Sequence, residues 1–499
     1  MAAFKCVSRF RLNSTKFYKN ANVYCLVLVL AVFCLMSIWW AFRLPMSSAP
    51  DEYMRLQVPL FIAENGCLPR GDDPAIINEV WGTSYAFSVY GSSLIAVPFI
   101  CVAKLVVPNS SAALIIAARL SNCLLAALNI VCIYLMGKKL KFGNLTSILA
   151  ATLFAFLPQN VFLAAYFNSE QLEFLSTNLV IILCLNAREN RWSYRSCFFL
   201  GCGLGVLALS YYYAYGVIIA AIIFYFSSIK KDFCLRTKSD YISAILYRPL
   251  VVFSGSFIVC GWFFIRNALL YNGDFIGMAT SSKTSEIYGA SGFKPSQRGT
   301  LRQQGYLPDC LFNQMNYSVY WPLSVAQSFI GTFGYMSIFV GNTSFVLYLL
   351  VFIPSLVIGL IRRLFTAKQT GDYLTFIPGL ITVATPFLLS IYYSWASDYQ
   401  PQGRYVMAGF GILSLLCAFG IVSLCQGLWT LLCAEIEVKS CKDESGNSLE
   451  KRLAISINDY GVFIKLVKFS VVATVLFYLL LFVRIFIHLI IPLLSSGVL

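Results

Sequence analysis

Two adjacent acidic residues, Asp51 and Glu52, follow the first long apolar segment of the sequence. A carboxylate in such a place can act as a general base, as an electrostatic anchor or as a metal ligand. The apolar segment, residues 21–42, has the ~20 residues that a helix needs to cross a bilayer. Basic residues precede it, and lysine and arginine beside a span favour the cytoplasmic side. The sequence therefore predicts that both acids lie at the external face of a membrane.

Further charged residues are predicted at the same external face by the alternation of apolar and basic segments, the acids in short connections just beyond helix ends. They are the acids Glu170, Asp274 and Asp398 and the bases Arg55, Lys104, Arg119, Arg266 and Arg404. Arginine presents a planar fork of donors that matches phosphate oxygens. External carboxylates with external arginines therefore suit the transfer of a group from a phospholipid-like donor. The acid takes the proton of an acceptor hydroxyl, and the cations stabilise the departing phosphate.

Simpler readings of the same residues stay open. The acidic pair could be a solvated loop start, and Glu170 could cap a helix that begins at Gln171. Arg404 and Arg266 could be anchors at the membrane interface. The sequence has a single histidine and no cysteine and histidine cluster, so it predicts no metal site. Cys67 and Cys310 fall in loops predicted to be external, where one disulfide could form.

The composition is that of a membrane protein. Of 499 residues, 59% are hydrophobic and only 12% are charged, which excludes a soluble enzyme with one anchor. A net charge of +15 would suggest nucleic acid in a soluble protein, but cytoplasmic loops accumulate lysine and arginine for topological reasons. We expect an all-α, polytopic membrane protein of about eleven transmembrane helices with the amino terminus in the cytoplasm.

The expected organisation follows from hydropathy and charge. Residues 85–107 are apolar, but a span there would place Lys138 and Lys139 outside, so they are expected to form an interfacial helix. Residues 197–228 lie between cytoplasmic charges and predict two short helices with a tyrosine-rich turn at 211–213. The predicted parts are a cytoplasmic terminus (1–20), a transmembrane module (21–267) with a first external loop (43–84), a long external loop and interfacial segment (268–341), and carboxy-terminal helices (342–499) with a cytoplasmic loop (435–465).

Several short motifs follow one another on the predicted external side. They are Asp51-Glu52, Ala118-Arg119-Leu120-Ser121, Phe167-Asn168-Ser169-Glu170, Ile265-Arg266-Asn267 with Tyr271-Asn272-Gly273-Asp274, the segment 328–334, and Gln402-Gly403-Arg404-Tyr405. In this order, over nearly the whole chain, they resemble the GT-C superfamily of polytopic membrane glycosyltransferases. Glu170 stands where that pattern more often has aspartate.

The resemblance implies a sugar donor on a polyprenyl phosphate, inversion at the anomeric carbon and an acceptor outside the cytoplasmic membrane. Asp51 matches the catalytic base, assisted by Glu52 and Glu170. The donor phosphate would be bound by Arg404, Arg266, Arg119 and Lys104, and the substrates would also contact Arg55, Tyr405, Gln402 and Asp274. No cofactor is obligatory on this reading, although a divalent cation could bind, and no nucleic acid partner is expected.

The size and the long external loop also resemble phage-type serotype-converting O-antigen glucosyltransferases. That narrower resemblance implies glucose as the sugar, O-antigen of lipopolysaccharide as the acceptor, and a periplasmic active site in a bacterial inner membrane. A polymerase or ligase of lipid-linked polysaccharides is an alternative, as is a lipid-binding assembly protein. A secondary transporter would need acids at the membrane midplane and usually internal repeats, which the sequence does not show.

Overall fold

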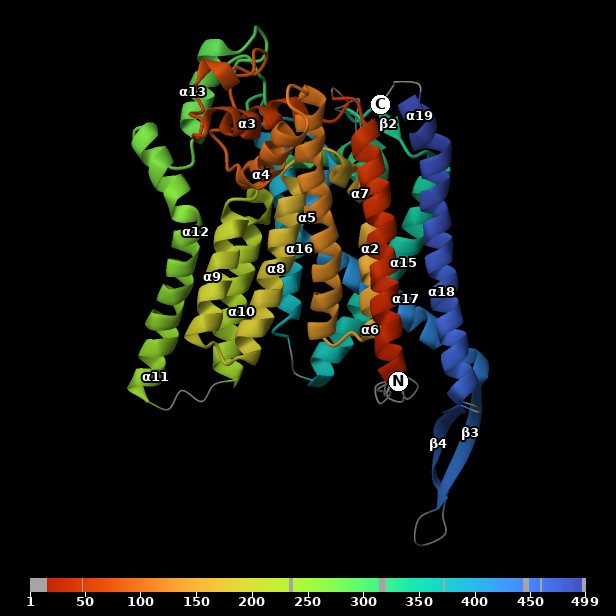
Figure 1. Ribbon diagram of the computed structural model, residues 1–499. Coiled ribbons are helices and arrows are strands. Elements are labelled where there is room, and N and C mark those ends of the chain that lie inside the picture. The colour runs from red at the N-terminus through yellow and green to blue at the C-terminus, as the bar shows by residue number, and fades with distance from the viewer. Residues whose placement is uncertain are drawn as a thin grey trace.

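The computed structural model describes residues 16–46, 48–232, 237–313, 320–370, 373–442, 448–457 and 460–495. Long helices lie side by side as one bundle (Figure 1). Within the described residues, eight helices are long and apolar enough to cross a membrane, or nine if a bent pair is one span. They are formed wholly or partly by α2 (Lys16–Arg43), α5 (Ser111–Lys139), α10 (Gly216–Asp232), α12 (Arg248–Leu270), α15 (Asn342–Thr370), α16 (Phe376–Ala396), α17 (Phe410–Cys433) and α18 (Tyr460–Ile485). The chain is an all-α polytopic membrane protein, as predicted.

The predicted number of eleven spans is not established. It would require two further helices, α8 (Glu170–Glu189) and α9 (Tyr194–Ala208), which run beside the others in Figure 1. α8 is less apolar than the eight, and α9 has only 15 residues. The predicted hairpin at 197–228 is present as α9 and α10, joined at Tyr212–Tyr215 by the short helix η2.

One end of the bundle carries the short elements and is called the α3 end; it is uppermost in Figure 1. The elements at this end include α3 (Glu52–Asn65), α4 (Gly91–Val106), α13 (Met278–Tyr288) and β2 (Ile338–Phe339). Further short elements are η1 (Pro74–Ile76), η4 (Pro308–Phe312), α14 (Trp321–Gly331), β1 (Thr332–Phe333) and η6 (Gly403–Gly409). The final helix α19 (Ile491–Ser495) also lies at this end, whereas the start of α2 lies at the opposite end.

The structure corrects several expectations of local form. The loop expected at 43–84 contains α3, and the helix expected at 85–107 begins only at Gly91. The segment at 324–340 is half helix and half a β1–β2 hairpin, because α14 ends where Thr332 pairs with Phe339. The loop expected at 435–465 forms two antiparallel strands, β3 (Ala434–Lys442) and β4 (Ser448–Ile457), opposite the α3 end (Figure 1). Most of the expected terminus 1–20, residues 1–15, lies outside the described residues.

The apolar residues after α5 form a bent pair of helices. α6 (Asn144–Ala155) and α7 (Pro158–Ala165) meet at an angle of 62°. Proline suits the first turn of a helix but cannot continue the preceding one, so Pro158 marks the break. Asn160 donates from Nδ2 to the carbonyl of Phe154 at 3.0 Å, which satisfies the interrupted end of α6. All of α7 is buried, and its end delivers Tyr166 to the α3 end of the bundle.

Two further helices complete the chain as described. α11 (Lys238–Ile242) begins with a capping box at Thr237 and continues through a π-helical turn, η3 (Ser243–Tyr247), into α12. A second π-helical turn, η7 (Phe486–Ile490), joins α18 to α19. The largest hydrophobic core cluster lies between α2, α5, α6, α7, α15, α17 and α18, and includes the fully buried Trp40, Phe162 and Phe333. This core supports the segments that carry the candidate site.

Candidate functional site

Asp51 occupies the residue just before α3 and has a left-handed backbone, with φ 61°. Aspartate is among the few residues other than glycine that adopt this conformation readily. The backbone carbonyl of Asp51 still accepts the hydrogen bond from Arg55 N, at 3.0 Å, that starts the helix. The side chain is 34% exposed, and its Oδ2 accepts a hydrogen bond from Nη2 of Arg404 at 2.8 Å. Its carboxylate is thus accessible and paired.

Arg404 lies on η6, 353 residues after Asp51 in the sequence, and is only 3% exposed to solvent. Its position depends on Gly403, whose amide donates to Oγ of Ser328 on α14 at 2.6 Å. Besides Asp51, the guanidinium donates to the hydroxyls of Tyr166 at 3.3 Å and Tyr405 at 3.0 Å. Its buried Nε has no hydrogen-bond partner among the described residues. Arg404 therefore keeps one donor available.

Glu170 lies between two arginines at the start of α8 and is fully buried. Its Oε1 is 3.5 Å from Nη1 of Arg404 and 4.0 Å from Nη2 of Arg55. Neither carboxylate oxygen has a hydrogen-bond partner among the described residues, so Glu170 does not cap its helix. Asn168 does so instead, accepting from the amides of Glu170 and Gln171.

Arg55, one turn into α3, completes the group. It donates to the hydroxyl of Ser169, and its guanidinium lies over the rings of Tyr85 at 4.6 Å and Tyr211 at 5.4 Å. Its buried Nε also lacks a partner within the described residues. We call Asp51, Arg404, Glu170 and Arg55 the charge quartet. Two acids balance two bases in formal charge, and two arginine donors, Nε of Arg55 and Nε of Arg404, have no hydrogen-bond partner among the described residues.

The quartet sets the ionisation of Asp51. Burial raises the pKa of this carboxyl, but the charges of Arg404 and Arg55 and the hydrogen bond from Arg404 lower it by more, so the pKa lies below its ordinary value. Asp51 is therefore ionised at neutral pH. It accepts a proton readily only after Arg404 has moved its charge to another partner.

Glu52 does not share the position of its neighbour. Its carboxylate is fully buried and forms two hydrogen bonds with Arg119 of α5, from Nε and Nη2, both at 2.7 Å. The amide of Phe167 donates to the same carboxylate at 2.9 Å. Nη1 of Arg119 also donates to the carbonyls of Ala41 at 2.9 Å and Leu44 at 2.5 Å. This pair joins α2, α3, α5 and the end of α7, and it is not open to a substrate.

Three other predicted residues make local contacts away from the quartet. Lys104 on α4 donates to the carbonyl of Ala63, about 18 Å along α3 from Asp51 at helical rise. Arg266 holds the segment after α3 by donating to the carbonyls of Leu68 at 3.1 Å and Pro69 at 2.9 Å. Asp274 accepts from Thr280 and Gly277 at the start of α13. The structure therefore gives each of these side chains a structural contact.

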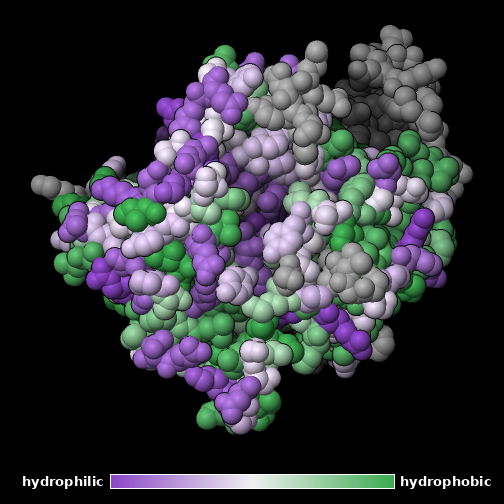
Figure 2. Space-filling view, turned by 90° about the horizontal axis from the view of Figure 1, so that it is seen from above, coloured by the Kyte–Doolittle hydropathy of each residue, from purple (hydrophilic) through white to green (hydrophobic). Residues whose placement is uncertain are grey.

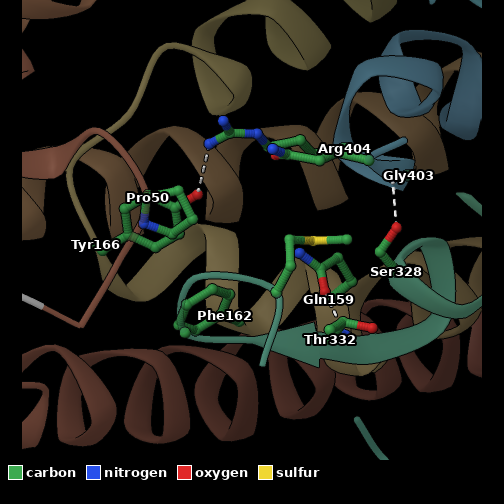
Figure 3. Close-up of a pocket in the computed structure, with 11 residues that line it drawn as sticks. Pro50, Gln159, Phe162, Tyr166, Ser328, Thr332, Gly403 and Arg404 are labelled. Atoms are coloured by element: carbon green, nitrogen blue, oxygen red, sulfur yellow. Dashed lines mark hydrogen bonds between the residues drawn. The ribbon is translucent and has the colours of Figure 1, made fainter. Parts of the chain in front are cut away.

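A pocket opens beside the quartet, with an empty volume of ≈ 230 Å³ that includes open solvent. Arg404 lies on one side of it and Thr332 of β1 on the other (Figure 3). The residues that line it are Pro50, Gln159, Phe162, Tyr166, Ser328, Thr332, Gly334, Met336, Gln402, Gly403 and Arg404. Viewed onto the α3 end, hydrophilic side chains surround a hollow near the centre of the molecule (Figure 2). Gln402, which was predicted to contact a substrate, borders this pocket.

Tyr405 contributes to a second wall behind Arg404. Its hydroxyl donates to Oε1 of Gln400 at 2.6 Å, and its ring stacks on Tyr213 with centroids 4.9 Å apart. The rings of Tyr212 and Tyr393 lie beside this stack, with centroids 5.1 Å apart. The tyrosine-rich turn of the α9–α10 hairpin therefore packs against the segment that carries Arg404.

Several site residues were missed by sequence reasoning. Gln159, Phe162 and Tyr166 line the pocket from one face of α7, at spacings of three and four residues that an amphipathic reading could have found. Glu173 lies one turn after Glu170, fully buried, and its carboxylate oxygens have no hydrogen-bond partner among the described residues. An acid inside an apolar segment is itself a signal of function.

The donors near the quartet suit an anion better than a metal ion. No group of three histidine, cysteine, aspartate or glutamate side chains that could hold a metal occurs in the part of the chain that the structure describes. Asp51 and Glu170 both face arginines, whereas the unpaired donors are guanidinium nitrogens. Cys67 and Cys310 are both free, so the disulfide considered from the sequence is not formed.

Comparisons with known proteins bear on this architecture. The family model described as dolichyl-phosphate-mannose-protein mannosyltransferase matches residues 111–258. A comparison with curated proteins gives no match. Among solved structures, the chain is similar to the oligosaccharyltransferase of Archaeoglobus fulgidus tethered to an acceptor peptide, with a TM-score of 0.52 and 15% identity over 93% of this chain and 55% of that one.

Two more structures are similar. AglB, an oligosaccharyltransferase from Archaeoglobus fulgidus in complex with an inhibitory peptide and a dolichol-phosphate, gives a TM-score of 0.50 at 15% identity over 94% of this chain and 56% of that one. ArnT from Cupriavidus metallidurans gives a TM-score of 0.47 at 12% identity, over 96% of this chain and 73% of that one. The chain spans only about half the length of the archaeal enzymes it matches. It is a multi-pass membrane protein whose fold is similar to that of these archaeal oligosaccharyltransferases.

Proposed function

We propose that the protein transfers a sugar from a polyprenyl-phosphate donor to a hydroxyl of an envelope glycan, with inversion at the anomeric carbon. The sugar proposed is glucose and the acceptor O-antigen, at the periplasmic face of a bacterial inner membrane. The observation that carries the proposal is the pairing of a partly exposed Asp51 with a buried Arg404 beside a pocket at the α3 end. A proton acceptor and an anion-binding group thus stand together.

The reaction needs Arg404 to change partner. The donor phosphate would take the charge of Arg404 and Arg55, whose Nε groups are unpaired within the described structure. Asp51, released from Arg404, then accepts the proton as the acceptor oxygen bonds to the anomeric carbon. The bond between that carbon and the phosphate oxygen breaks, and its electron pair leaves with the polyprenyl phosphate. Donor binding therefore comes first and makes Asp51 a base.

Two comparisons support the class of donor. The matched family model is described by its dolichyl-phosphate-mannose donor, and one structure of similar fold holds a dolichol-phosphate. Both lipids are polyprenyl phosphates. A monophosphate leaving group can be stabilised by the two arginines, so we propose that no metal is obligatory, although a divalent cation could assist.

The predicted topology supports the proposal that the site faces the periplasm. Lys138 and Lys139, in the last turn of α5, lie at the end of that helix opposite Arg119, and they favour the cytoplasm. The α3 end would then face the periplasm. Glu52, Arg119, Arg266, Lys104 and Asp274 would act only by holding the segments that frame the site.

The proposal is tested with purified protein, tritiated undecaprenyl phosphate glucose and the envelope glycolipids extracted from the host cells, with and without EDTA. Asp51→Asn is expected to lower transfer by about 10²- to 10⁴-fold. The matched control is Asp398→Asn, because Asp398 is also a partly exposed carboxylate paired with an arginine, Arg298, at 3.4 Å.

The control should keep wild-type transfer. Full activity of Asp51→Asn, or no transfer by the wild-type protein, contradicts the proposal. Loss of transfer in EDTA would show that a metal ion is required, contrary to the proposal. It would leave the proposed role of Asp51 unaffected.

A further inference from the structure

The β1–β2 hairpin is firmly seated on the core. Phe333 is fully buried and packs against Trp40 and Phe162, with ring centroids 5.3 Å away in each case. The amide of Thr332 donates to Oε1 of Gln159 on α7 at 2.9 Å. Buried aromatic contacts and a buried hydrogen bond fix the base of the hairpin, so its tip has a defined place.

The four-residue tip, 334–337, has an unusual backbone. Gly334 and Met336 both have φ 62°, in the left-handed region. Glycine adopts this conformation freely, but methionine does so rarely, and such residues cluster at binding sites where the surroundings hold them. Asp51, with φ 61°, is another such residue close to the same pocket. The tip is therefore held in a form that its sequence does not favour.

The tip lies beside the start of α3. A Cβ on Gly334 would be 3.7 Å from the carbonyl oxygen of Ser48, three residues before Asp51. Gly334 and Met336 line the pocket together with Pro50, and Arg404 lies across from β1 (Figure 3). Burial and the charges of Asp51 and Glu52 raise the pKa of Tyr335, which is consistent with this closeness. The hairpin tip and Asp51 thus form one edge of the site.

Tyr335 stands out at this edge because its side chain is 61% exposed, although the hairpin base beneath it is buried. The face of a tyrosine ring packs well on the apolar C–H face of a pyranose, and its hydroxyl can bond sugar hydroxyls. The donor phosphate is expected at Arg404, on the opposite side of the pocket. Tyr335 is therefore an exposed ring at the edge of the site on which Asp51 lies.

We propose that Tyr335, held at the tip of the β1–β2 hairpin beside Asp51, binds a sugar ring of the acceptor glycan and sets the affinity for the acceptor. This inference rests on the proposed function. Its chemistry is that of a carbohydrate with an exposed pyranose face. Tyr335 acts as a specificity residue, and takes no part in proton transfer or phosphate binding.

The test titrates tritiated undecaprenyl phosphate glucose and, separately, the host's extracted envelope glycolipids against purified variants. Tyr335→Ala should raise the half-saturating glycolipid concentration about tenfold, while the half-saturating donor concentration stays unchanged. Tyr335→Phe should keep most of the affinity because it retains the ring. Tyr288→Ala is the matched control, since Tyr288 on α13 is similarly exposed at 57%.

The outcomes separate the two proposals. Unchanged acceptor saturation in Tyr335→Ala, with Asp51→Asn inactive, overturns the role of Tyr335 and leaves the proposed function standing. Equal losses for donor and acceptor, not restored by Tyr335→Phe, also overturn it, because they show a structural effect on the whole site. Full activity of Asp51→Asn overturns the proposed function itself.

Discussion

At the scale of single residues, Arg404 has two opposing effects on the carboxylate of Asp51. An arginine 2.8 Å away keeps the carboxylate ionised, but it also makes that carboxylate a weak base. A donor phosphate that draws Arg404 away would remove this restraint only when the leaving group is in place. Water or an acceptor arriving first would find the base occupied, which limits unproductive reaction.

This coupling predicts a pH effect. Because Arg404 lowers the pKa of Asp51 while burial raises it, Arg404→Gln should raise that pKa. The carboxylate must be ionised to accept a proton, so the acid limb of the pH profile of kcat/KM should move to higher pH in the residual activity of this variant. The measurement is the pH dependence of sugar transfer by wild-type and variant protein.

Arg298→Gln is the control for that experiment, because Arg298 pairs with Asp398 rather than with Asp51. Its acid limb should coincide with that of the wild type. An unmoved acid limb in Arg404→Gln would show that Asp51 is not the group that titrates.

The sequence indicated which charged residues belong to this site better than it indicated which of them pair with each other. It predicted that Asp51, Glu52, Glu170, Arg55 and Arg404 lie at one end of the bundle, because hydropathy and charge are local signals. It treated Asp51 and Glu52 as one acidic pair, whereas the two side chains have different partners. Successive residues on a helix point about 100° apart.

The partners themselves lie far along the chain. Glu52 pairs with an arginine 67 residues away, and Asp51 with one 353 residues away. No local pattern encodes such contacts. The sequence therefore predicted that Arg119 binds the donor phosphate, whereas the packing of α5 against α2 and α3 pairs it with the buried acid Glu52.

At the scale of elements, buried amides link the helices beneath the site. Asn178 on α8 donates to Asn129 on α5 at 3.0 Å, and Asn129 donates to the carbonyl of Gln171 at 3.1 Å. Gln171 in turn donates to Asn160 on α7 at 3.2 Å. In an apolar interior these bonds hold the bent α7 and the start of α8, where Glu170 lies. Hydropathy alone could predict neither the bend nor this network.

Substitution of one glycine tests that network. Gly411 on α17 faces Asn178 so closely that an added Cβ would lie 2.2 Å from Oδ1 of the asparagine. Gly411→Ala should therefore destabilise the protein by about 1–3 kcal/mol and lower transfer through displacement of α8. The measurement is the thermal unfolding temperature in detergent, together with transfer activity.

Gly427→Ala is the matched control on the same helix, since nothing lies within 4 Å of its added Cβ. Alanine is a better helix former than glycine, so this variant should be as stable as the wild type or slightly more stable. Equal stability of the two variants would contradict the close contact at Gly411.

At the scale of the whole molecule, the α3 end is also tied together across distant segments. Arg298 from the long loop lies over the ring of Trp81 at 5.2 Å and pairs with Asp398 beyond α16. Arg302 lies over Trp395 at the end of α16, and Trp395 donates to the carbonyl of Tyr306 at 2.7 Å. The loops thus form one structured cap on this end, which the sequence had described only as polar and external.

The orientation of the molecule can be tested at Cys67, a free and exposed cysteine just after α3. In spheroplasts, a membrane-impermeant maleimide should label Cys101→Ser protein, and labelling should fall when Cys67→Ser is added. The background change removes the other exposed cysteine at this end, on α4. Labelling of Cys67 only after permeabilisation would place the α3 end, and Asp51 with it, in the cytoplasm.

The left-handed backbone at Asp51 restricts what evolution can place there. A longer acid such as glutamate fits this conformation poorly, and glycine fits it but has no carboxylate. Asparagine shares the backbone preference and the shape of aspartate, and a single base change in the codon produces it. If Asp51 is the base of the proposed transfer, that one base change would abolish transfer while residue 51 keeps its backbone conformation.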